Sequence, residues 1–97
     1  MADELTIKAF QKHIHDKYYA SDKARGTAPT FMWFVEEVGE LSTALHGQKG
    51  VIDRDNLEEE FADVFAWLCT LANINDIDLE KAIQKKYLTG DGPKGVK

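Results

Sequence analysis

Two pairs of acidic residues carry the clearest chemical signal in the sequence. Glu37 and Glu40 form the first pair, and Glu60 and Asp63 form the second. Residues three apart lie on the same side of an α-helix, about one turn from each other along its axis, so each pair presents its carboxylates together. If the two helices lie side by side and antiparallel, all four carboxylates converge on one spot.

The neighbours of both pairs favour a metal site over a solvated helix face. Trp33 shares the face of the first pair and Trp67 that of the second, at about 100° of rotation per residue. Neither helix places a Lys or Arg between its acids, as exposed helix faces commonly do. Crowded carboxylates beside apolar groups repel one another unless a cation neutralises them. Oxygen-only ligands select a hard ion, so we expect Mg²⁺, with Mn²⁺ as the alternative.

The first element that must position these acids is an amphipathic helix over residues 31–45. Thr30 is a suitable N-cap, and Gly47 and Gly50 can supply positive φ in the loop that follows. Its core-facing stripe is predicted to contain Phe31, Phe34, Val35, Val38, Leu41 and Leu45.

The second element is a helix that ends near residue 73 and is capped by Asp53 or Asn56. Its core-facing stripe is predicted to contain Leu57, Phe61, Val64, Phe65, Leu68 and Ala72. Small residues follow another side of this helix at Ala62, Ala66 and Thr70. Such a strip lets a second helix approach closely, and we interpret it as a candidate dimer contact.

The remaining segments complete an all-α fold. They are predicted as a helix over 3–19 capped by Asp3 or Thr6, an irregular loop over 20–29, and a helix over 79–87 capped by Asp78. We therefore expect a small antiparallel bundle of about four helices. At 97 residues the chain is short enough to favour completion of the core by oligomerisation. Residues 1–88 form the predicted helical domain and 89–97 a flexible tail.

Composition excludes several function classes. The net charge of -5 argues against binding to a nucleic acid polymer, which needs a basic surface. No apolar run is long enough to span a membrane, and the acidic start does not resemble a signal peptide. The single cysteine, Cys69, is predicted as a buried thiol without a disulfide partner in the chain. These features predict a cytoplasmic protein.

The residues around the acids resemble a known family. The two segments that carry the likeness are Trp33-Phe34-Val35-Glu36-Glu37-Val38-Gly39-Glu40-Leu41 and Leu57-Glu58-Glu59-Glu60-Phe61-Ala62-Asp63-Val64. This pattern of E-x-x-E, a spacer and E-x-x-D is similar to the MazG-like nucleotide pyrophosphohydrolases of the all-α nucleoside triphosphate pyrophosphatase superfamily. The likeness extends over roughly residues 10–87.

The resemblance implies an activity and roles for the acids. It implies Mg²⁺-dependent hydrolysis of a (deoxy)nucleoside triphosphate to the monophosphate and pyrophosphate, with a role in removing modified nucleotides. It places Mg²⁺ at the two acidic pairs and implies a homodimer or homotetramer. It also makes Glu36 the residue that orients or deprotonates the attacking water, although the helical wheel turns Glu36 away from the metal face.

Substrate contacts follow from the same likeness and from the residues themselves. The resemblance implies that Lys86 contacts phosphate. Trp33 and Trp67 are candidates to stack on a base by the nature of their rings, with a buried place in the core as the alternative. Family members often carry an arginine one turn after this lysine, where the present chain has Gly90. Arg25, just before the first acidic helix, is therefore the candidate for an additional phosphate or ribose contact.

Two other functions fit the same sequence. A phosphoribosyl-ATP pyrophosphatase has a similar acid pattern and differs in its substrate. A non-catalytic helical interaction module could use the acids to hold a structural cation or a basic partner. Replacing Glu37 or Asp63 with Ala separates an enzyme from a module, because only an enzyme has turnover to lose.

Overall fold

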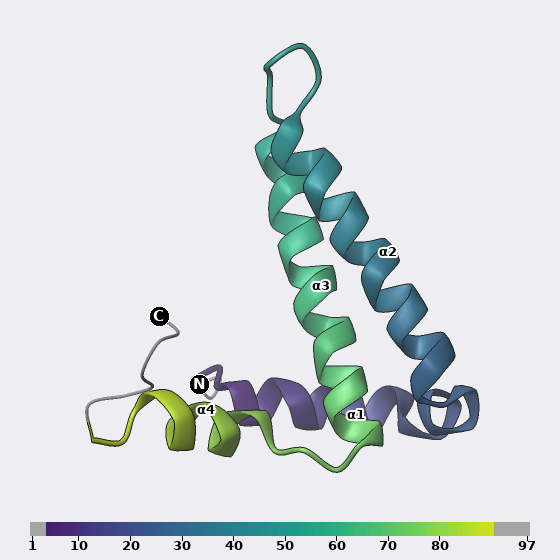
Figure 1. Cartoon of the computed structure of the whole chain (residues 1–97), viewed down its shortest axis with the longest axis vertical. Coiled ribbons are helices and arrows are strands. Elements are labelled where there is room, and N and C mark those ends of the chain that lie inside the picture. The colour runs from purple at the N-terminus through teal and green to yellow at the C-terminus, as the bar shows by residue number, and fades with distance from the viewer. Residues whose placement is uncertain (1–3, 91–97) are drawn as a thin grey trace.

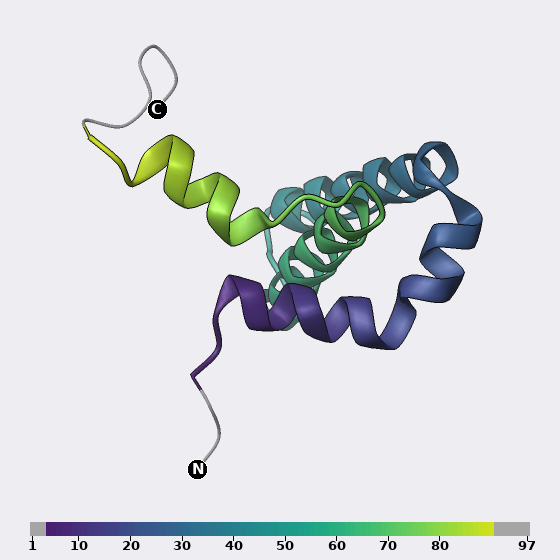
Figure 2. The same cartoon turned by 90° about the horizontal axis from the view of Figure 1, so that it is seen from below.

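The computed structural model describes residues 4–90, which form four helices and no strand. The helices are α1 (Ile7–Arg25), α2 (Thr27–His46), α3 (Arg54–Ile74) and α4 (Leu79–Tyr87). α2 and α3 form a long antiparallel hairpin, and α1 lies across its base with α4 beside it (Figure 1). Figure 2 shows the same crossing from below. The predicted all-α class is confirmed, and most of the predicted tail, 91–97, lies outside the described residues.

Side-chain caps fix the start of three helices. Thr6, Asp53 and Asp78 each accept a hydrogen bond from the backbone N–H three residues later, at 2.9, 3.2 and 3.1 Å. Each bond satisfies one of the N–H groups that a helix start leaves without an acceptor. The alternative cap Asn56 lies inside α3, and the alternative Asp3 falls outside the described residues. None of the described helices is long and apolar enough to cross a membrane.

The prediction of an irregular loop over 20–29 is wrong. α1 continues to Arg25 and α2 begins at Thr27, so only Gly26 interrupts the helices, with φ of 86°. Pro29 is accommodated because it lies in the first turn of α2, where backbone N–H groups have no intrahelical acceptor. Thr30 is consequently not a cap: its side chain is fully buried, and its hydroxyl donates to the Gly26 carbonyl at 2.6 Å.

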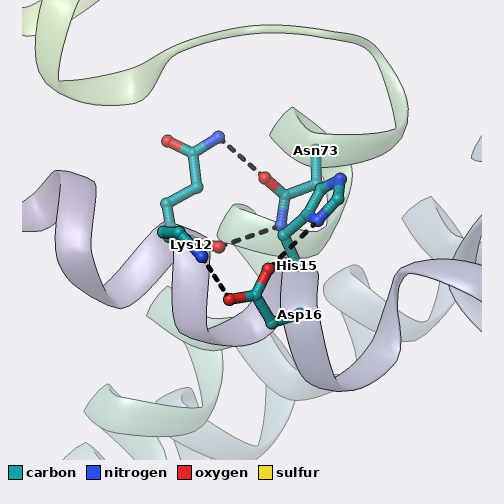
Figure 3. Close-up of polar contacts among 5 residues, drawn as sticks. Lys12, His15, Asp16 and Asn73 are labelled. Atoms are coloured by element: carbon teal, nitrogen blue, oxygen red, sulfur yellow. Dashed lines mark hydrogen bonds and ion pairs between the residues drawn. The ribbon is translucent and has the colours of Figure 1, made fainter.

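A satisfied polar clamp joins α1 to the end of α3 and the start of α4. The Gln11 Nε2 group donates to Asn73 Oδ1 at 2.9 Å and to the Ile77 carbonyl at 2.7 Å, and its Oε1 accepts from the Leu79 N–H at 3.0 Å. Asn73 Nδ2 in turn donates to the Gln11 carbonyl at 3.2 Å (Figure 3). Both side chains are buried. The clamp therefore fixes where α1 crosses the hairpin.

The small-residue strip on α3 receives α1 of the same chain. Thr70 is only 5% exposed, and it lines a cleft together with Ala66 and with Ile14 of α1. Further along, Phe10 of α1 stacks on Phe65 of α3 with ring centroids 5.8 Å apart. A helix therefore approaches the strip at Ala66 and Thr70, whereas Ala62 is exposed, and the dimer contact predicted for this strip stays a prediction. Cys69, one residue before Thr70, is fully buried, and burial raises its pKa to about 11.

The predicted core stripe of α2 is largely exposed. Phe31, Val35 and Leu45 are 52%, 50% and 48% exposed, and Val38 is also exposed. α2 instead turns Thr30, Phe34, Glu37, Leu41 and Ala44 toward the rest of the chain. On α3, likewise, Phe61 and Leu68 are exposed. The spacing of these apolar residues does not show that the rest of the chain leaves them exposed.

Candidate metal centre and adjoining cleft

α2 and α3 bring the two acidic pairs together. Glu37 of α2 and Glu60 and Asp63 of α3 each offer a carboxylate oxygen, and these oxygens all lie within 4.8 Å of one another. Glu40 lies near them, since repulsion from its charge contributes to the raised pKa of both Glu37 and Glu60. The structure therefore brings three of the four predicted carboxylates together, and Glu40, which is exposed on α2, is a neighbour of this group of three.

The cluster holds negative charge that the described residues do not compensate. The pKa of Glu37 is raised first by burial and then by repulsion from Glu40, Asp63 and Glu60. The pKa of Glu60 is raised by burial and then by Glu40 and Asp63. Among residues 4–90, no Lys or Arg forms an ion pair with any of the four acids. Buried carboxylates that repel one another in this way would be stabilised by a bound cation.

Two orphaned oxygens show how well a metal ion would fit. The Oε2 atoms of Glu37 and Glu60 are buried and have no hydrogen-bond partner. A buried acceptor without a partner is unfavourable, so we expect a bound ligand to contact these two oxygens. Mg²⁺ binds carboxylate oxygens at about 2.1 Å, which separates two ligands by at most ~4.2 Å. Because adjacent ligands of an octahedral ion lie only ~3 Å apart, the three oxygens would close by up to ~2 Å on binding one ion, and the donor set suits a hard divalent cation.

Two tryptophans and an arginine flank the cluster. Trp33 precedes Glu37 by one helical turn and Trp67 follows Asp63 by one turn, so they meet across the hairpin. Their ring centroids are 6.3 Å apart, with 19° between the ring planes. The guanidinium carbon of Arg25 lies 5.2 Å from the centroid of the Trp67 ring. The structure thus brings the predicted substrate residues Trp33 and Arg25 together through Trp67.

A cleft of about 380 Å³ opens beside the cluster, between α1 and α3. Its walls include Ile14 and Tyr18 from α1 and Trp67 from α3, and its polar lining includes Arg25 and Asp63. A volume of this size and a largely apolar wall with a few polar groups are typical of small-molecule sites. Asp63 belongs to both the cleft and the acid cluster, so a ligand in the cleft would lie next to a bound ion.

The structure leaves two predicted site residues outside this group. Glu36 is exposed and belongs neither to the acid cluster nor to the lining of the cleft. Lys86 lies on α4, which starts near the N-terminal part of α1 and then extends away from α1 and from the hairpin (Figures 1 and 2). Its ammonium nitrogen is 5.3 Å from the centroid of the neighbouring Tyr87 ring.

Sequence reasoning also missed a residue of the cleft. Asp22 lines it and is only 5% exposed. The prediction of a loop over 20–29 is the reason, because a loop assignment does not indicate where an acidic side chain points. Had the helix been extended to Arg25, the spacing of three between Asp22 and Arg25 would have indicated an ion pair on one helix face.

Comparison with known proteins identifies the family. A search of curated proteins finds no significant match to the chain. A family model described as the MazG nucleotide pyrophosphohydrolase domain matches residues 26–88, more than half of the chain. The matched range contains α2, α3 and α4, and with them all four clustered acids. The chain therefore belongs to the MazG nucleotide pyrophosphohydrolase family.

Proposed function

We propose that the protein hydrolyses a (deoxy)nucleoside triphosphate to the monophosphate and pyrophosphate in a Mg²⁺-dependent reaction, and that modified nucleotides are among its substrates. The observation that carries this proposal is the set of carboxylate oxygens of Glu37, Glu60 and Asp63, which lie within 4.8 Å of one another on a MazG domain. Membership of the family supports a nucleotide substrate, and the uncompensated acids support the metal.

The four acids hold the ion, with Mn²⁺ as a substitute for Mg²⁺. Glu37 and Glu60 contribute the buried oxygens that lack partners, and Glu40 and Asp63 contribute from the exposed rim. A bound Mg²⁺ supplies Lewis-acid polarisation of the phosphoryl oxygens and lowers the pKa of water. Because both helices are long and pack along each other, they hold the carboxylates at a fixed separation before substrate arrives.

The nucleoside occupies the cleft between α1 and α3. Trp67 and Tyr18 offer aromatic surface for the base, and the stacked Trp33 extends that surface toward α2. Arg25 presents its guanidinium at the same wall. The α-phosphate then lies next to Asp63, since this residue joins the cleft to the acid cluster.

Glu36 and Lys86 can reach the substrate only in an assembly of two or more copies of the chain. Glu36 keeps the proposed role of orienting or deprotonating water, and its exposed position means that it must be turned toward the phosphates by the assembled protein. Lys86 requires an α4 helix from a neighbouring copy to reach the phosphates, since its own α4 extends away from the hairpin (Figures 1 and 2). Replacing Glu36 with Gln should lower kcat by roughly 100-fold if it acts as a base.

We further propose that the chain assembles as a homodimer or homotetramer. α2 and α3 carry several exposed apolar side chains, among them Phe31, Val35, Val38, Leu45, Phe61 and Leu68, and we take these as the assembly surface. Monomers rarely expose a large continuous apolar surface. Replacing Val35 with Glu should convert the assembly to monomers in sedimentation measurements, whereas replacing the exposed polar Glu58 with Gln should not. An unchanged assembly in the Val35 variant would contradict this interface.

The decisive assay measures pyrophosphate release from a panel of substrates with Mg²⁺. The panel contains standard and modified dNTPs and NTPs, together with phosphoribosyl-ATP. Release from at least one nucleoside triphosphate, abolished by a chelator and restored by Mg²⁺, is the expected result. Turnover of phosphoribosyl-ATP alone would assign the other pyrophosphatase activity. No turnover by folded protein would favour the non-catalytic module.

A further inference from the structure

Arg25 is held in place by three separate contacts. Its Nη2 donates to Asp22 Oδ1 at 2.6 Å, and its Nε donates to Thr30 Oγ1 at 3.0 Å. Its guanidinium carbon lies 5.2 Å from the centroid of the Trp67 ring. Because these partners come from α1, α2 and α3, the orientation of Arg25 depends on all three helices.

The two hydrogen-bond partners of Arg25 are more buried than Arg25 itself. The Asp22 side chain is 7% exposed and that of Arg25 is 27% exposed, while Thr30 is fully buried. Asp22 Oδ2 is buried and has no hydrogen-bond partner. A buried carboxylate with one bonded oxygen is a costly way to connect two helical turns. An apolar or amide side chain at this position would avoid that cost, which points to a role for the charge.

The contacts leave part of the guanidinium free. Arginine carries five N–H donors, and the two bonds to Asp22 and Thr30 use two of them. Arg25 lines the cleft beside Asp63, and the cleft walls around it include Trp67, Tyr18 and Ile14. A ligand group that meets the remaining donors in an aromatic and apolar cleft has the chemistry of a nucleobase edge.

We propose that Asp22 is a positioning residue that orients Arg25, so that Arg25 donates to an acceptor atom of the bound nucleobase, a carbonyl oxygen or a ring nitrogen. This inference rests on the proposed function, since it takes the substrate to be a nucleoside triphosphate. Thr30 sets the plane of the same guanidinium through Nε. Asp22 does not touch the substrate in this arrangement and acts only through Arg25.

Kinetics of an isosteric variant test this role. Asp22→Asn keeps an oxygen for Arg25 and removes the charge, so we expect KM to rise roughly 10- to 100-fold with little change in kcat. Asp16→Asn is the matched control, because Asp16 lies on the same helix in an exposed pair with Lys12. In an Arg25→Ala background, Asp22→Asn should have no further effect on KM. An equal effect in both backgrounds would overturn the proposal.

Inhibition by tripolyphosphate separates a base contact from a phosphate contact. If Arg25 binds the base, Arg25→Ala should leave inhibition by tripolyphosphate with Mg²⁺ unchanged, while KM for the nucleotide rises. Weaker inhibition in this variant would assign Arg25 to a phosphate and overturn the base contact.

A measurement without nucleotide keeps the inference separable from the proposed function. The Nε–H of Arg25 should give its own shifted and slowly exchanging signal in a ¹H–¹⁵N spectrum, because Thr30 accepts from it. Asp22→Asn should broaden that signal or return it to the position of free arginine, and Asp16→Asn should leave it unchanged. A signal that persists in the Asp22 variant would show that Asp22 does not hold Arg25. Absence of turnover in the wild type would instead overturn the proposed function and the base contact.

Discussion

Two groups of polar side chains inside this small protein differ in whether their atoms are satisfied. At the crossing of α1 and α3, the side-chain nitrogen and oxygen atoms of Gln11 and Asn73 all take part in hydrogen bonds. At the acid cluster, Glu37 and Glu60 each keep a buried oxygen without a partner. A satisfied group stabilises the fold by itself, whereas an unsatisfied group costs stability unless something else binds it. This difference distinguishes a group that stabilises the fold from a group suited to bind a ligand.

The largest effect in this comparison is expected from Glu37→Gln. This change keeps the shape of the side chain and removes one charge from the proposed metal ligands. Since loss of a group that merely supports a ligand costs about 10- to 100-fold, loss of the ligand itself should lower kcat/KM by more than ~100-fold. The checks are pyrophosphate release and calorimetric titration with Mg²⁺.

Glu58→Gln is the matched control for that variant. Glu58 is exposed near the start of α3 and lies outside the cluster, so its replacement should leave both readouts unchanged. Circular dichroism should show that both variants remain helical. An active Glu37→Gln enzyme with normal Mg²⁺ affinity would remove Glu37 from the metal site.

The opposite behaviour is expected at the clamp. Gln11→Ala leaves the Ile77 carbonyl, Asn73 Oδ1 and the Leu79 N–H without their partner. We expect the free energy of unfolding to fall by roughly 2–4 kcal/mol, with kcat per folded molecule little changed. Urea unfolding at one fixed protein concentration measures the loss, because assembly would otherwise shift the midpoint.

Lys12→Ala provides the comparison for the clamp. Lys12 is the next residue along α1, and its exposed pair with Asp16 is drawn beside the clamp in Figure 3. Exposed ion pairs contribute about 0–1 kcal/mol, so this change should be nearly neutral. If Gln11→Ala were equally neutral, the clamp would not carry the stability assigned to it.

The sequence predicted the elements whose signals are local. Asp78 was predicted as an N-cap, and Thr6 and Asp53 each as one of two candidates, because the cap bond spans only three residues. The meeting of Glu37 with Glu60 and Asp63 followed from helical spacing and one assumption, that the two helices pair. Tertiary contacts were harder to predict. The burial of Asp22 and Thr30 depends on α1 continuing to Arg25, and a Gly with a nearby Pro concealed that continuation.

Burial of apolar residues was the other limit of the sequence. Phe31 and Val35 have the spacing of a core stripe, yet the chain leaves both about half exposed. Periodicity reports that a helix face is apolar and does not report which surface covers it. In contrast, the polar Glu37 is half-buried on the α2 face that carries the buried Ala44, while Trp33, one turn before it, is 48% exposed. A sequence therefore predicts a helix and the composition of its faces better than it predicts which of those faces is buried.

The smallest predicted effect is on the pH dependence of stability in metal-free protein. The folded pKa values of Glu37 and Glu60 are raised, by burial first and then by repulsion among the acids. Between the ordinary glutamate pKa and these raised values, the folded state binds more protons than the unfolded state. Stability must then fall as pH rises through this window, and the loss is complete above the raised pKa values. Asp16 acts in the opposite direction at lower pH, because its bond to Lys12 lowers its pKa.

Urea midpoints between pH 5 and pH 8 check this prediction. Without metal, the midpoint should be higher near pH 5 than near pH 8, and Glu60→Gln should flatten the curve because one of the two titrating groups is gone. Saturating Mg²⁺ should raise the midpoint most at pH 8, where the acids are fully charged and gain most from a cation. The clamp of Gln11 and Asn73 contains no titratable group, so Gln11→Ala should shift the whole curve downward and keep its slope. A metal-free protein whose stability increases from pH 5 to pH 8 would show that the acids are too far apart to repel one another.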